Sequence, residues 1–360
     1  MSSPPVRAVL LGYGLAGRVF HAPLIAASPD MTLEAVVTAD PGRRRAAGER
    51  HPGTALLPSP AEAWARAAEF DVAVVATPNR THVPLAEAAL AAGLHVVVDK
   101  PLATTAAAAR ALATTAAERE LLLTVFHNRR WDGDFLTLRD LIESGALGDV
   151  ARFESRFERW RPAIKPGWRE LPAAEEGGGV LLDLGSHLID QALQLFGSAR
   201  AVYAEIDRRR GEAQVDDDAF VAITHANGVR SHLWVSAVAA QLGPRMRVLG
   251  SQAAYVKHGL DVQEGQLEAG MTPESPRWGE EPEHAWGRLG ALDDLRAVPT
   301  KRGAYERFYE GLVAALRGGA SPPVVVDEAI AVLAVIDAAR RSVREGEAIE
   351  TTMPARDRMG

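Results

Sequence analysis

The sequence of 360 residues contains no cysteine, which excludes disulfide bonds and thiolate metal sites and fits a reducing cytoplasm. It has no excess of positive charge: its formal net charge of −7 gives no electrostatic reason to expect nucleic acid or an anionic membrane as a partner. No run approaches the roughly 18 consecutive apolar residues that suggest a membrane-spanning helix, and the first residues lack a signal-peptide cleavage site. We therefore expect a soluble, cytoplasmic protein.

Apolar residues, in contrast, are plentiful, at 47% of the chain. At roughly 150 residues per domain, the length suggests two domains. Within residues 1–126, short β-branched runs alternate with alanine-rich stretches, which is typical of a doubly wound parallel sheet covered by helices on both faces. The expected strands are 6–12, 33–38, 71–77, 94–99 and 121–127, and the expected helices lie near 15–27, 59–68, 81–92 and 104–119.

The character of the sequence changes in residues 127–360, which we expect to form the second domain. Six of the seven tryptophans lie beyond residue 130, and longer alternating runs appear there. Asn227-Gly228 separates two such runs and favours a tight hairpin turn. The pattern predicts an α/β domain with an antiparallel sheet that has one polar or partner-facing side. Helices are expected near 303–317 and 327–345, and the Pro/Gly/Glu-rich segment 264–300 is expected to be a long excursion.

Three spaced glycines, Gly12-x-Gly14-x-x-Gly17, follow the first expected strand and open a helix. Gly12 permits a tight turn, Gly14 lets the backbone approach a pyrophosphate, and Gly17 allows helix and strand to pack closely. The phosphates would sit at the helix N-terminus. The motif alone is weak, but the strand–helix units around it favour a dinucleotide site. The expected phosphate loop is Gly12, Tyr13, Gly14, Leu15, Ala16 and Gly17.

The choice between NAD and NADP stays open at this point. Asp40 follows Gly17 by 23 residues, near the spacing expected for an acid that binds the ribose of NAD. Asp40-Pro41 is equally a good helix N-cap followed by proline at the first helical position. The arginines that follow, Arg43, Arg44 and Arg45, could instead face the 2′-phosphate of NADP.

The stretch "LHVVVDKPL" places Asp99 and Lys100 at the carboxyl end of an apolar strand, where ligands of open α/β sheets bind. Pro101 biases Lys100 toward an extended conformation, so its ammonium group is directed. The alternative is a surface lysine in a turn, but the apolar residues upstream favour a functional lysine. "VATPNRTH" ends the neighbouring strand, and its His82 also fits a helix start. The cofactor-facing set expected here is Thr77, Pro78, Asn79, His82, Asp99 and Lys100.

Asp183 and His187 lie four residues apart, and so share one face if their segment is helical. Histidine suits proton transfer near neutral pH, and a carboxylate one turn away can fix its tautomer. Two structural interpretations compete: Asp183 as a helix cap and His187 as a core histidine. For the acids Asp216, Asp217 and Asp218 we favour a solvated turn over a metal site. We expect residues 157–170, which mix arginine, lysine and tryptophan, to line a sugar pocket or a domain edge.

A family resemblance is carried by "GYGLAGRVFHAPLI", "ATPNRTH", "HVVVDKP", "FHNRRWDGDFLTL", "LLDLGSHLIDQALQLFG" and "YVKHGLDVQE". Over residues 6–350 the chain resembles the glucose–fructose oxidoreductase and inositol dehydrogenase family (Gfo/Idh/MocA). Within that family it is most similar to the NADP-dependent scyllo-inositol dehydrogenase branch. The resemblance implies an N-terminal Rossmann domain followed by an α/β domain with a large open antiparallel sheet, which often forms the subunit interface. It therefore implies a homodimer or homotetramer.

The resemblance also implies roles for individual residues. Asp99-Lys100-Pro101 stands where the family has Glu-Lys-Pro, and Asp183 with His187 matches its catalytic Asp-x-x-x-His. By this resemblance His187 takes the proton of a substrate hydroxyl, Lys100 stabilises the developing negative charge, and Asp183 orients His187 or binds an adjacent hydroxyl. Ala39 and Asp40 stand where NADP-preferring members usually have serine or arginine. The implied substrate-binding residues are Asn128, Arg129, Trp131, Trp168, Asp183 and His187, and no metal is needed.

The function expected from the sequence is an oxidoreductase that uses NAD or NADP and acts on a hydroxyl carbon of a cyclic polyol or sugar. Its partner would be this small molecule, with no nucleic acid and no membrane. Two alternatives remain. One is a glycosidase that oxidises and re-reduces one carbon with tightly held NAD. The other is a non-catalytic regulator that senses a dinucleotide.

Overall fold

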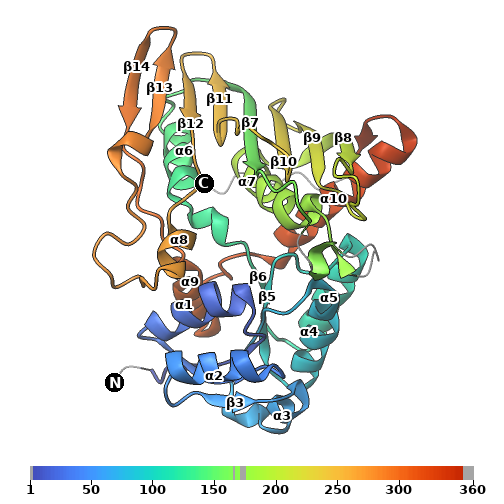
Figure 1. The fold of residues 1–360 in the computed structure, drawn as a ribbon, viewed down its shortest axis with the longest axis vertical. Coiled ribbons are helices and arrows are strands. Elements are labelled where there is room, and N and C mark those ends of the chain that lie inside the picture. Colours follow the sequence, from blue (N-terminus) through green and yellow to red (C-terminus); the bar gives the residue numbers. More distant parts are fainter. Residues whose placement is uncertain (1–2, 165–166, 171–175, 352–360) are drawn as a thin grey trace. The chain divides into compact units, whose positions relative to one another are not determined.

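The computed structural model describes residues 3–164, 167–170 and 176–351. It contains two compact units, and each has its own β-sheet (Figure 1). Neither unit is a continuous stretch of chain. Unit 1 comprises Met1–Trp131, Val262–Gly279 and Ala304–Ile330, and unit 2 comprises Asp132–Asp261, Glu280–Gly303 and Ala331–Gly360.

Unit 1 contains a six-stranded sheet in which every strand is parallel to its neighbours. The strand order β3-β2-β1-β4-β5-β6 confirms the doubly wound fold, with the switch in direction between β1 and β4. The four middle strands are apolar because both faces of the sheet are covered. The short strand β3 was not expected. The strands are β1 Val6–Leu11, β2 Met31–Val37, β3 Ala55–Leu57, β4 Val72–Val75, β5 His95–Asp99 and β6 Leu123–Phe126.

Two helices of unit 1 begin after a residue whose side chain caps them. Asp40 accepts a hydrogen bond from the backbone N of Arg43 (2.7 Å), and Thr105 accepts one from the backbone N of Ala108 (3.2 Å). In Figure 1, α1 and the pair α4 and α5 lie on opposite sides of the sheet. These elements are the π-helix η1 Ala16–His21, α1 Ala22–Ala27, α2 Pro41–Arg50, α3 Pro60–Ala65, α4 His82–Ala91 and α5 Ala106–Glu118, followed late in the chain by α8 Gln263–Glu268 and α9 Glu306–Leu316.

Aromatic side chains bring α9 into the core of unit 1. The ring of Phe126, at the end of β6, packs edge-on against Phe308 (centroids 4.9 Å apart) and lies 6.0 Å from the ring of Tyr309. The backbone N of Tyr305 donates to Oε1 of Gln263 (2.8 Å), which joins α9 to α8. These contacts are buried, and they explain why two late segments of the chain belong to the first unit.

Unit 2 contains a nine-stranded sheet in the order β14-β13-β12-β11-β7-β10-β9-β8-β15. Only β7 and β10 pair in parallel, so the expectation of a mostly antiparallel sheet is confirmed. The hairpin between β9 and β10 turns at Asn227-Gly228, as the sequence predicts. The strands are β7 Val150–Glu158, β8 Ala199–Asp207, β9 Asp218–His225, β10 Arg230–Ser236, β11 Met246–Gly250, β12 Ala254–Lys257, β13 Gly287–Ala291, β14 Asp294–Val298 and β15 Ile349–Glu350.

Residues 264–300, expected to be a long excursion, contain regular secondary structure. This stretch contains most of α8 and the hairpin of β13 and β14, which extends the sheet beyond β12. Its glycines serve packing as well as turns: a Cβ added at Gly287 would lie 2.3 Å from the hydroxyl of Tyr255. Gly287 is therefore a glycine because the buried ring of Tyr255, on the adjacent strand, leaves no space for a side chain.

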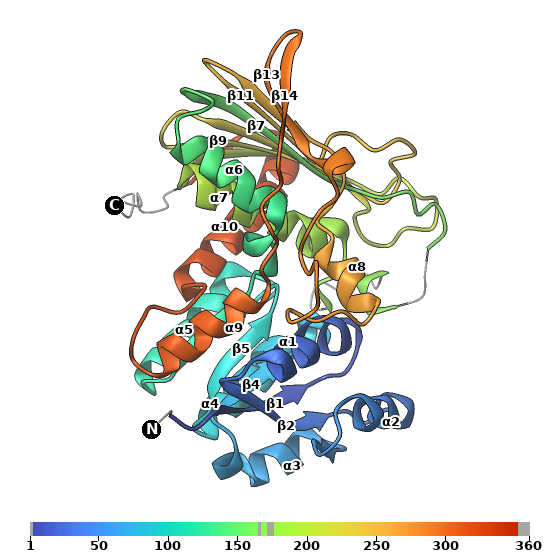
Figure 2. The same ribbon diagram turned by 90° about the vertical axis from the view of Figure 1, so that its left-hand side faces the viewer.

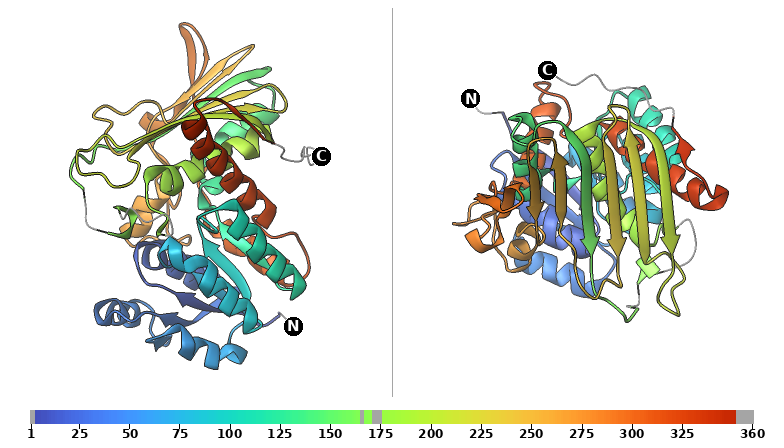
Figure 3. Two further views of the ribbon diagram at one scale, coloured as in Figure 1. Left: turned by 90° about the vertical axis from the view of Figure 1, so that its right-hand side faces the viewer. Right: turned by 90° about the horizontal axis from the view of Figure 1, so that it is seen from above.

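Helices cover one face of the unit 2 sheet. In Figure 2, α6 (Gly133–Glu143), α7 (Ser186–Phe196) and most of α10 (Val326–Glu345) lie against the same face. The opposite face carries no helix among the described residues of this unit, and Figure 3 shows its strands in full view. Strand β9 alternates between buried residues and partly exposed residues along its length, which is the pattern of a sheet with one covered face.

His225, at the end of β9, is a fully buried histidine of unit 2. Its Nδ1 lies 2.8 Å from the carbonyl O of Gly197 and its Nε2 lies 2.8 Å from the hydroxyl of Ser231. Burial lowers its pKa to about 4, and the hydrogen bond to Gly197 opposes this shift only in part. The folded protein therefore holds His225 neutral at pH values where the unfolded chain binds a proton.

We expect this histidine to make stability depend on pH. The unfolded chain gains a proton near pH 6.5 and the folded chain only near pH 4, so stability is full above about pH 6.5 and falls by up to about 3 kcal/mol toward pH 4. His225→Gln should flatten the pH dependence of the free energy of unfolding, measured by urea denaturation at pH 7 and pH 4.5. His258→Gln, at an exposed histidine of the same unit, is the control. Equal slopes in all three proteins would contradict the expectation.

Candidate functional site

The three glycines after β1 have the geometry that a dinucleotide site requires. Gly12 has a φ of +97°, and a Cβ there would lie 2.4 Å from the carbonyl O of Ala76. A Cβ on Gly17 would lie 2.0 Å from the carbonyl O of Gly12. At Gly14 the nearest atom is Nη1 of Arg43, at 4.0 Å, so the backbone there is open to approach. Two glycines thus allow the turn and the close packing, and the third leaves room for a pyrophosphate.

The side chains of this loop are divided between the core and the solvent. Tyr13 is buried, its ring packs edge-on against His51 (6.1 Å), and burial raises the pKa of its hydroxyl. Leu15 is 47% exposed. The side chain of Tyr13 therefore anchors the loop in the core, and only the backbone of this residue is available to a phosphate.

The residues after β2 bear on the choice of nucleotide. Asp40 caps α2, so the capping interpretation of its position is correct. Arg44 is occupied by the backbone, because it donates to the carbonyl O of Thr38 (3.3 Å) and of Ala39 (3.2 Å). Arg43 is exposed, and its guanidinium lies beside the glycine loop. Of the three arginines, Arg43 is the one placed next to the loop that would hold the phosphates.

His82 joins the ends of two strands. Its Nε2 lies 2.9 Å from the carbonyl O of Thr77, after β4, and its Nδ1 lies 2.7 Å from the carbonyl O of Pro101, after β5. The ring is buried, which lowers its pKa against the raising effect of Asp99. His82 is indeed the first residue of α4, but its buried ring holds the two loops in place.

A series of buried polar side chains, Asp99, His21 and Tyr309, lies next to the backbone of Lys100. The backbone N of Lys100 donates to Oδ1 of Asp99 (3.0 Å), and Nε2 of His21 lies 3.7 Å from the same oxygen. Nδ1 of His21 faces the hydroxyl of Tyr309 at 2.7 Å. Burial raises the pKa of Asp99, but the hydrogen bond and charge of His21 and the charge of Lys100 outweigh it, so the pKa is lowered. Asp99 is thus kept ionised beside the lysine.

The residues after β6 form buried contacts of unit 1. Arg129 is paired with Glu264 (2.9 Å), and Arg130 is paired with Glu328. The ring of Trp131 lies edge-on to Phe308, 5.9 Å away. Asn128, directly after β6, is buried as well. The predicted substrate residues Asn128, Arg129 and Trp131 are therefore packed within unit 1. Their contact with a substrate stays a prediction.

Asp183 and His187 lie in one continuous helical segment of unit 2. Asp183 is in the π-helix η7 (Leu181–Gly185), and His187 is in the first turn of α7, which follows directly. The segment is capped by Asp216, whose carboxylate accepts from the backbone N of Leu181 (2.7 Å). The interpretation of Asp183 as the cap was therefore wrong. His187 is 5% exposed, and its ring stacks on Phe157 of β7 (6.3 Å, 28°).

Asp183 lines a pocket of about 80 Å³ within unit 2. We call it the arginine pocket. Nε of Arg169 lies 3.4 Å from Oδ1 of Asp183, and the Arg169 guanidinium also lies over the ring of Trp168 (4.4 Å). The charged residues of the pocket wall are Arg159, Arg161, Arg169, Arg210, Glu170, Asp183 and Asp216.

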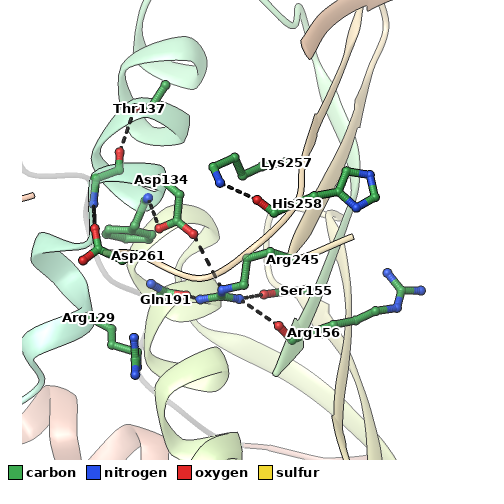
Figure 4. Close-up of polar contacts among 12 residues, drawn as sticks. Arg129, Asp134, Thr137, Ser155, Arg156, Gln191, Arg245, Lys257, His258 and Asp261 are labelled. Atoms are coloured by element: carbon green, nitrogen blue, oxygen red, sulfur yellow. Dashed lines mark hydrogen bonds and ion pairs between the residues drawn. The ribbon is translucent and has the colours of Figure 1, made fainter. Parts of the chain in front are cut away.

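Arg245 anchors α7 to the sheet, as Figure 4 shows. This arginine is 3% exposed; its guanidinium donates to the hydroxyl of Ser155 on β7 (2.5 Å) and to Oε1 of Gln191 on α7 (2.7 Å). Its Nε lies 3.6 Å from Oδ2 of Asp134 on α6. Gln191 is one helical turn beyond His187, so this arginine fixes the helix that carries the histidine. The sequence analysis did not single out Arg245.

Within the described ranges, no group of three or more histidine, aspartate or glutamate side chains is arranged to hold a metal ion. The three consecutive acids of the sequence have separate tasks: Asp216 caps η7, Asp217 accepts from Arg210 (2.8 Å), and Asp218 pairs with Arg209 (3.4 Å). None of the helices formed by the described residues is both long enough and apolar enough to cross a membrane.

A doubly wound parallel sheet with this glycine loop defines a protein that binds a dinucleotide. Comparison with known proteins identifies the family. Residues 6–127 match the oxidoreductase family with an NAD-binding Rossmann fold, and residues 135–256 match the GFO/IDH/MocA C-terminal domain. The chain belongs to the GFO/IDH/MocA family of oxidoreductases.

Similar proteins cover nearly the whole chain. The scyllo-inositol 2-dehydrogenase (NADP(+)) IolW of Bacillus subtilis (strain 168) is 33% identical over 348 residues, which are 96% of this chain and 95% of the relative. The uncharacterized oxidoreductase YdgJ of Escherichia coli (strain K12) is 39% identical over 340 residues, with 93% and 95% covered. The solved structure of the oxidoreductase yvaA from Bacillus subtilis has a TM-score of 0.91 at 32% identity, with 98% and 99% covered. This chain is accordingly a dehydrogenase that acts on CH–OH groups with NAD or NADP.

We expect Arg43 to discriminate between the two nucleotides. Arg43→Ala should raise the KM for NADP by about tenfold and leave the KM for NAD nearly unchanged, because a guanidinium–phosphate hydrogen bond is lost only with NADP. Steady-state kinetics with both cofactors measures the difference, and Arg45→Ala on the same helix is the control. Equal KM values before and after the substitution would remove Arg43 from the nucleotide site.

The buried ion pair of Arg245 gives a second expectation. Arg245→Met leaves the carboxylate of Asp134 buried without its partner, which should lower the free energy of unfolding by about 3–5 kcal/mol. The double variant with Asp134→Leu should recover much of this loss, because both charges are then removed. Urea denaturation of the single and double variants measures the coupling. Additive losses in the double variant would show that the two side chains do not interact.

Proposed function

We propose that the protein transfers hydride between a nicotinamide cofactor and a hydroxyl carbon of a cyclic polyol or sugar. The observation that carries the proposal is the placement of Asp183 in the wall of a pocket lined by several charged side chains, with His187 one turn further along the same helical segment. A pocket with several charged hydrogen-bonding groups suits a ligand rich in hydroxyls. The 33% identity to a scyllo-inositol 2-dehydrogenase over nearly the whole chain supports this substrate class.

In this proposal His187 is the general base. An imidazole titrates near neutral pH and can accept the proton of a substrate hydroxyl as the carbon loses hydride. Asp183 orients the imidazole or binds a neighbouring hydroxyl, and it forms an ion pair with Arg169. The position of His187 is supported by the ring of Phe157 and, through Gln191, by Arg245.

Lys100 stabilises the negative charge that develops on the substrate oxygen as the proton leaves. Its ammonium group is positively charged, and the backbone N of the same residue donates to the carboxylate of Asp99. When bound, the nicotinamide supplies the acceptor for hydride, so the overall reaction converts CH–OH to C=O and releases one proton. Asn128, Arg129, Trp131 and Trp168 are the side chains that we propose to hold the ring of the substrate.

A substrate panel tests the proposed function. The purified full-length protein is assayed with inositols, aldoses and their derivatives, each with NAD and with NADP, by the absorbance of the reduced nicotinamide. Reduction of the cofactor by at least one cyclic polyol or sugar supports the proposal. Turnover of a glycoside without net formation of reduced cofactor would favour the glycosidase that uses transient oxidation.

Two substitutions test the assigned roles. His187→Ala and Lys100→Ala should each lower kcat by about 100-fold or more, because each removes a group that moves a proton or stabilises charge in the transition state. Binding of the cofactor to His187→Ala, measured by calorimetry, should stay nearly unchanged. His284→Ala, at an exposed histidine of unit 2, should keep its full activity. Normal kcat in a folded His187→Ala protein would exclude the histidine from the reaction.

We also propose that the face of the unit 2 sheet without helices joins copies of this chain into a homo-oligomer. The aromatic rings of Phe220 and Trp234 lie 5.1 Å apart on this face, and the guanidinium of Arg156 lies 4.0 Å over the ring of Trp234. Both aromatic residues are partly exposed in the single chain. Aromatic and arginine side chains are the residues most enriched at the centres of protein interfaces.

A further inference from the structure

We infer that the substrate carries an acidic group, a carboxylate or a phosphate, which binds in the arginine pocket of unit 2. The inference deepens the proposed function and rests on it, because the pocket also contains Asp183, which that function places at the substrate.

Arg159 and Arg161 extend β7 beyond its last assigned residue. The backbone N of Arg159 donates to the carbonyl O of Ser236 (2.8 Å), and that of Arg161 donates to the carbonyl O of Ala237 (2.7 Å). Residues two apart in an extended chain project to the same side. Both arginines line the pocket, whereas Trp160 between them is 56% exposed and is not part of the wall. The extended backbone therefore presents two guanidinium groups to one cavity.

The acidic residues of the wall are already matched by other groups. Arg210, 7% exposed, is paired with Glu170 (3.0 Å) and with Asp217 (2.8 Å), so its positive charge is fully matched. Arg169 is paired with Asp183. Asp216 accepts the backbone N–H at the start of η7, and burial raises the pKa of its carboxyl, which favours the uncharged form.

This pairing leaves Arg161 as the arginine of the wall whose charge can serve a ligand. Arg161 is exposed, and within the described part of the chain its side chain has no ion pair and no hydrogen bond. The hydroxyl groups of a neutral polyol can accept hydrogen bonds from this guanidinium, but they gain no attraction between opposite charges. A carboxylate or phosphate gains a charge-assisted, two-pronged hydrogen bond.

One arginine of the pocket wall and the proposed base, His187, contact the same phenylalanine ring. The guanidinium of Arg159 lies 4.9 Å over the ring of Phe157, and the ring of His187 stacks on the same phenylalanine. The cavity of about 80 Å³ has space for several water molecules, and hence for a small anionic group. An acidic group bound at Arg161 would lie in the same pocket as Asp183, where the proposed function places a hydroxyl of the ring.

The test compares acidic sugars with their neutral counterparts on the full-length protein with bound cofactor. The probes are D-glucuronate, which carries a carboxylate, D-glucose 6-phosphate, which carries a phosphate, and D-glucose, which carries neither. Binding is measured by calorimetry, and turnover is measured by the reduced nicotinamide. We expect at least one acidic probe to bind tenfold or more tightly than D-glucose, and the stronger of the two identifies the acidic group.

Variants of Arg161 show whether this preference arises in the pocket. Arg161→Ala should remove most of the tenfold preference, and Arg161→Lys, which keeps the charge but loses the fork of donors, should retain part of it. Arg208→Ala, at an exposed arginine outside the pocket wall, should keep the preference in full. Equal binding of acidic and neutral probes, or a preference that survives Arg161→Ala, overturns the inference.

The two readouts separate this inference from the proposed function. Oxidation of neutral polyols with no preference for an acidic probe would leave the dehydrogenase intact and would remove the anion site. Tight binding of an acidic probe that depends on Arg161, without any reduction of the cofactor by the whole panel, would keep the anion site and would refute the proposed substrate class.

Discussion

The placement of the helical segment Leu181–Phe196 is the constraint on which the chemistry of unit 2 depends. Asp216 satisfies the backbone at its beginning, and Arg245 binds Gln191 near its end. Arg245 is a buried charged side chain and Asp216 a partly buried carboxyl group, and both are costly to desolvate unless their partners are present. Such groups tolerate little displacement, so the histidine and the aspartate between them are held at defined positions on the sheet.

In unit 1 the candidate site residues are positioned by the ends of strands instead of by a helix. Parallel strands deliver Thr77, Asp99 and Asn128 at the same edge of the sheet, because their carboxyl ends coincide. The loops that follow would be free to move without further contacts. His82 ties two of them together, and His21 with Tyr309 supports the carboxylate next to the lysine. Buried histidines thus perform in this unit the task that an arginine performs in the other.

Features encoded by neighbouring residues were predictable from the sequence. The glycine loop, the hairpin at Asn227-Gly228 and the capping aspartate before α2 all act within a few residues, and the apolar strands follow their own composition. What could not be foreseen depends on partners far along the chain. His21 meets Tyr309 across 288 positions, and Arg245 meets Ser155 across 90. The hairpin of β13 and β14 was missed for the same reason. Gly287, at its start, is needed because the ring of Tyr255 on another strand leaves no room for a Cβ.

The discontinuity of unit 1 has a consequence for its biosynthesis. The ribosome releases the six strands of the first sheet long before α9 has been made, and α9 supplies the aromatic rings that cover Phe126. Nascent chains usually fold domain by domain from the N-terminus. The core of unit 1 cannot be completed until residues near position 316 have emerged. Until then, part of its apolar surface stays uncovered. Synthesis of this enzyme therefore includes an interval in which all six strands of the first sheet have been made but the apolar surface around Phe126 is not yet covered by α9.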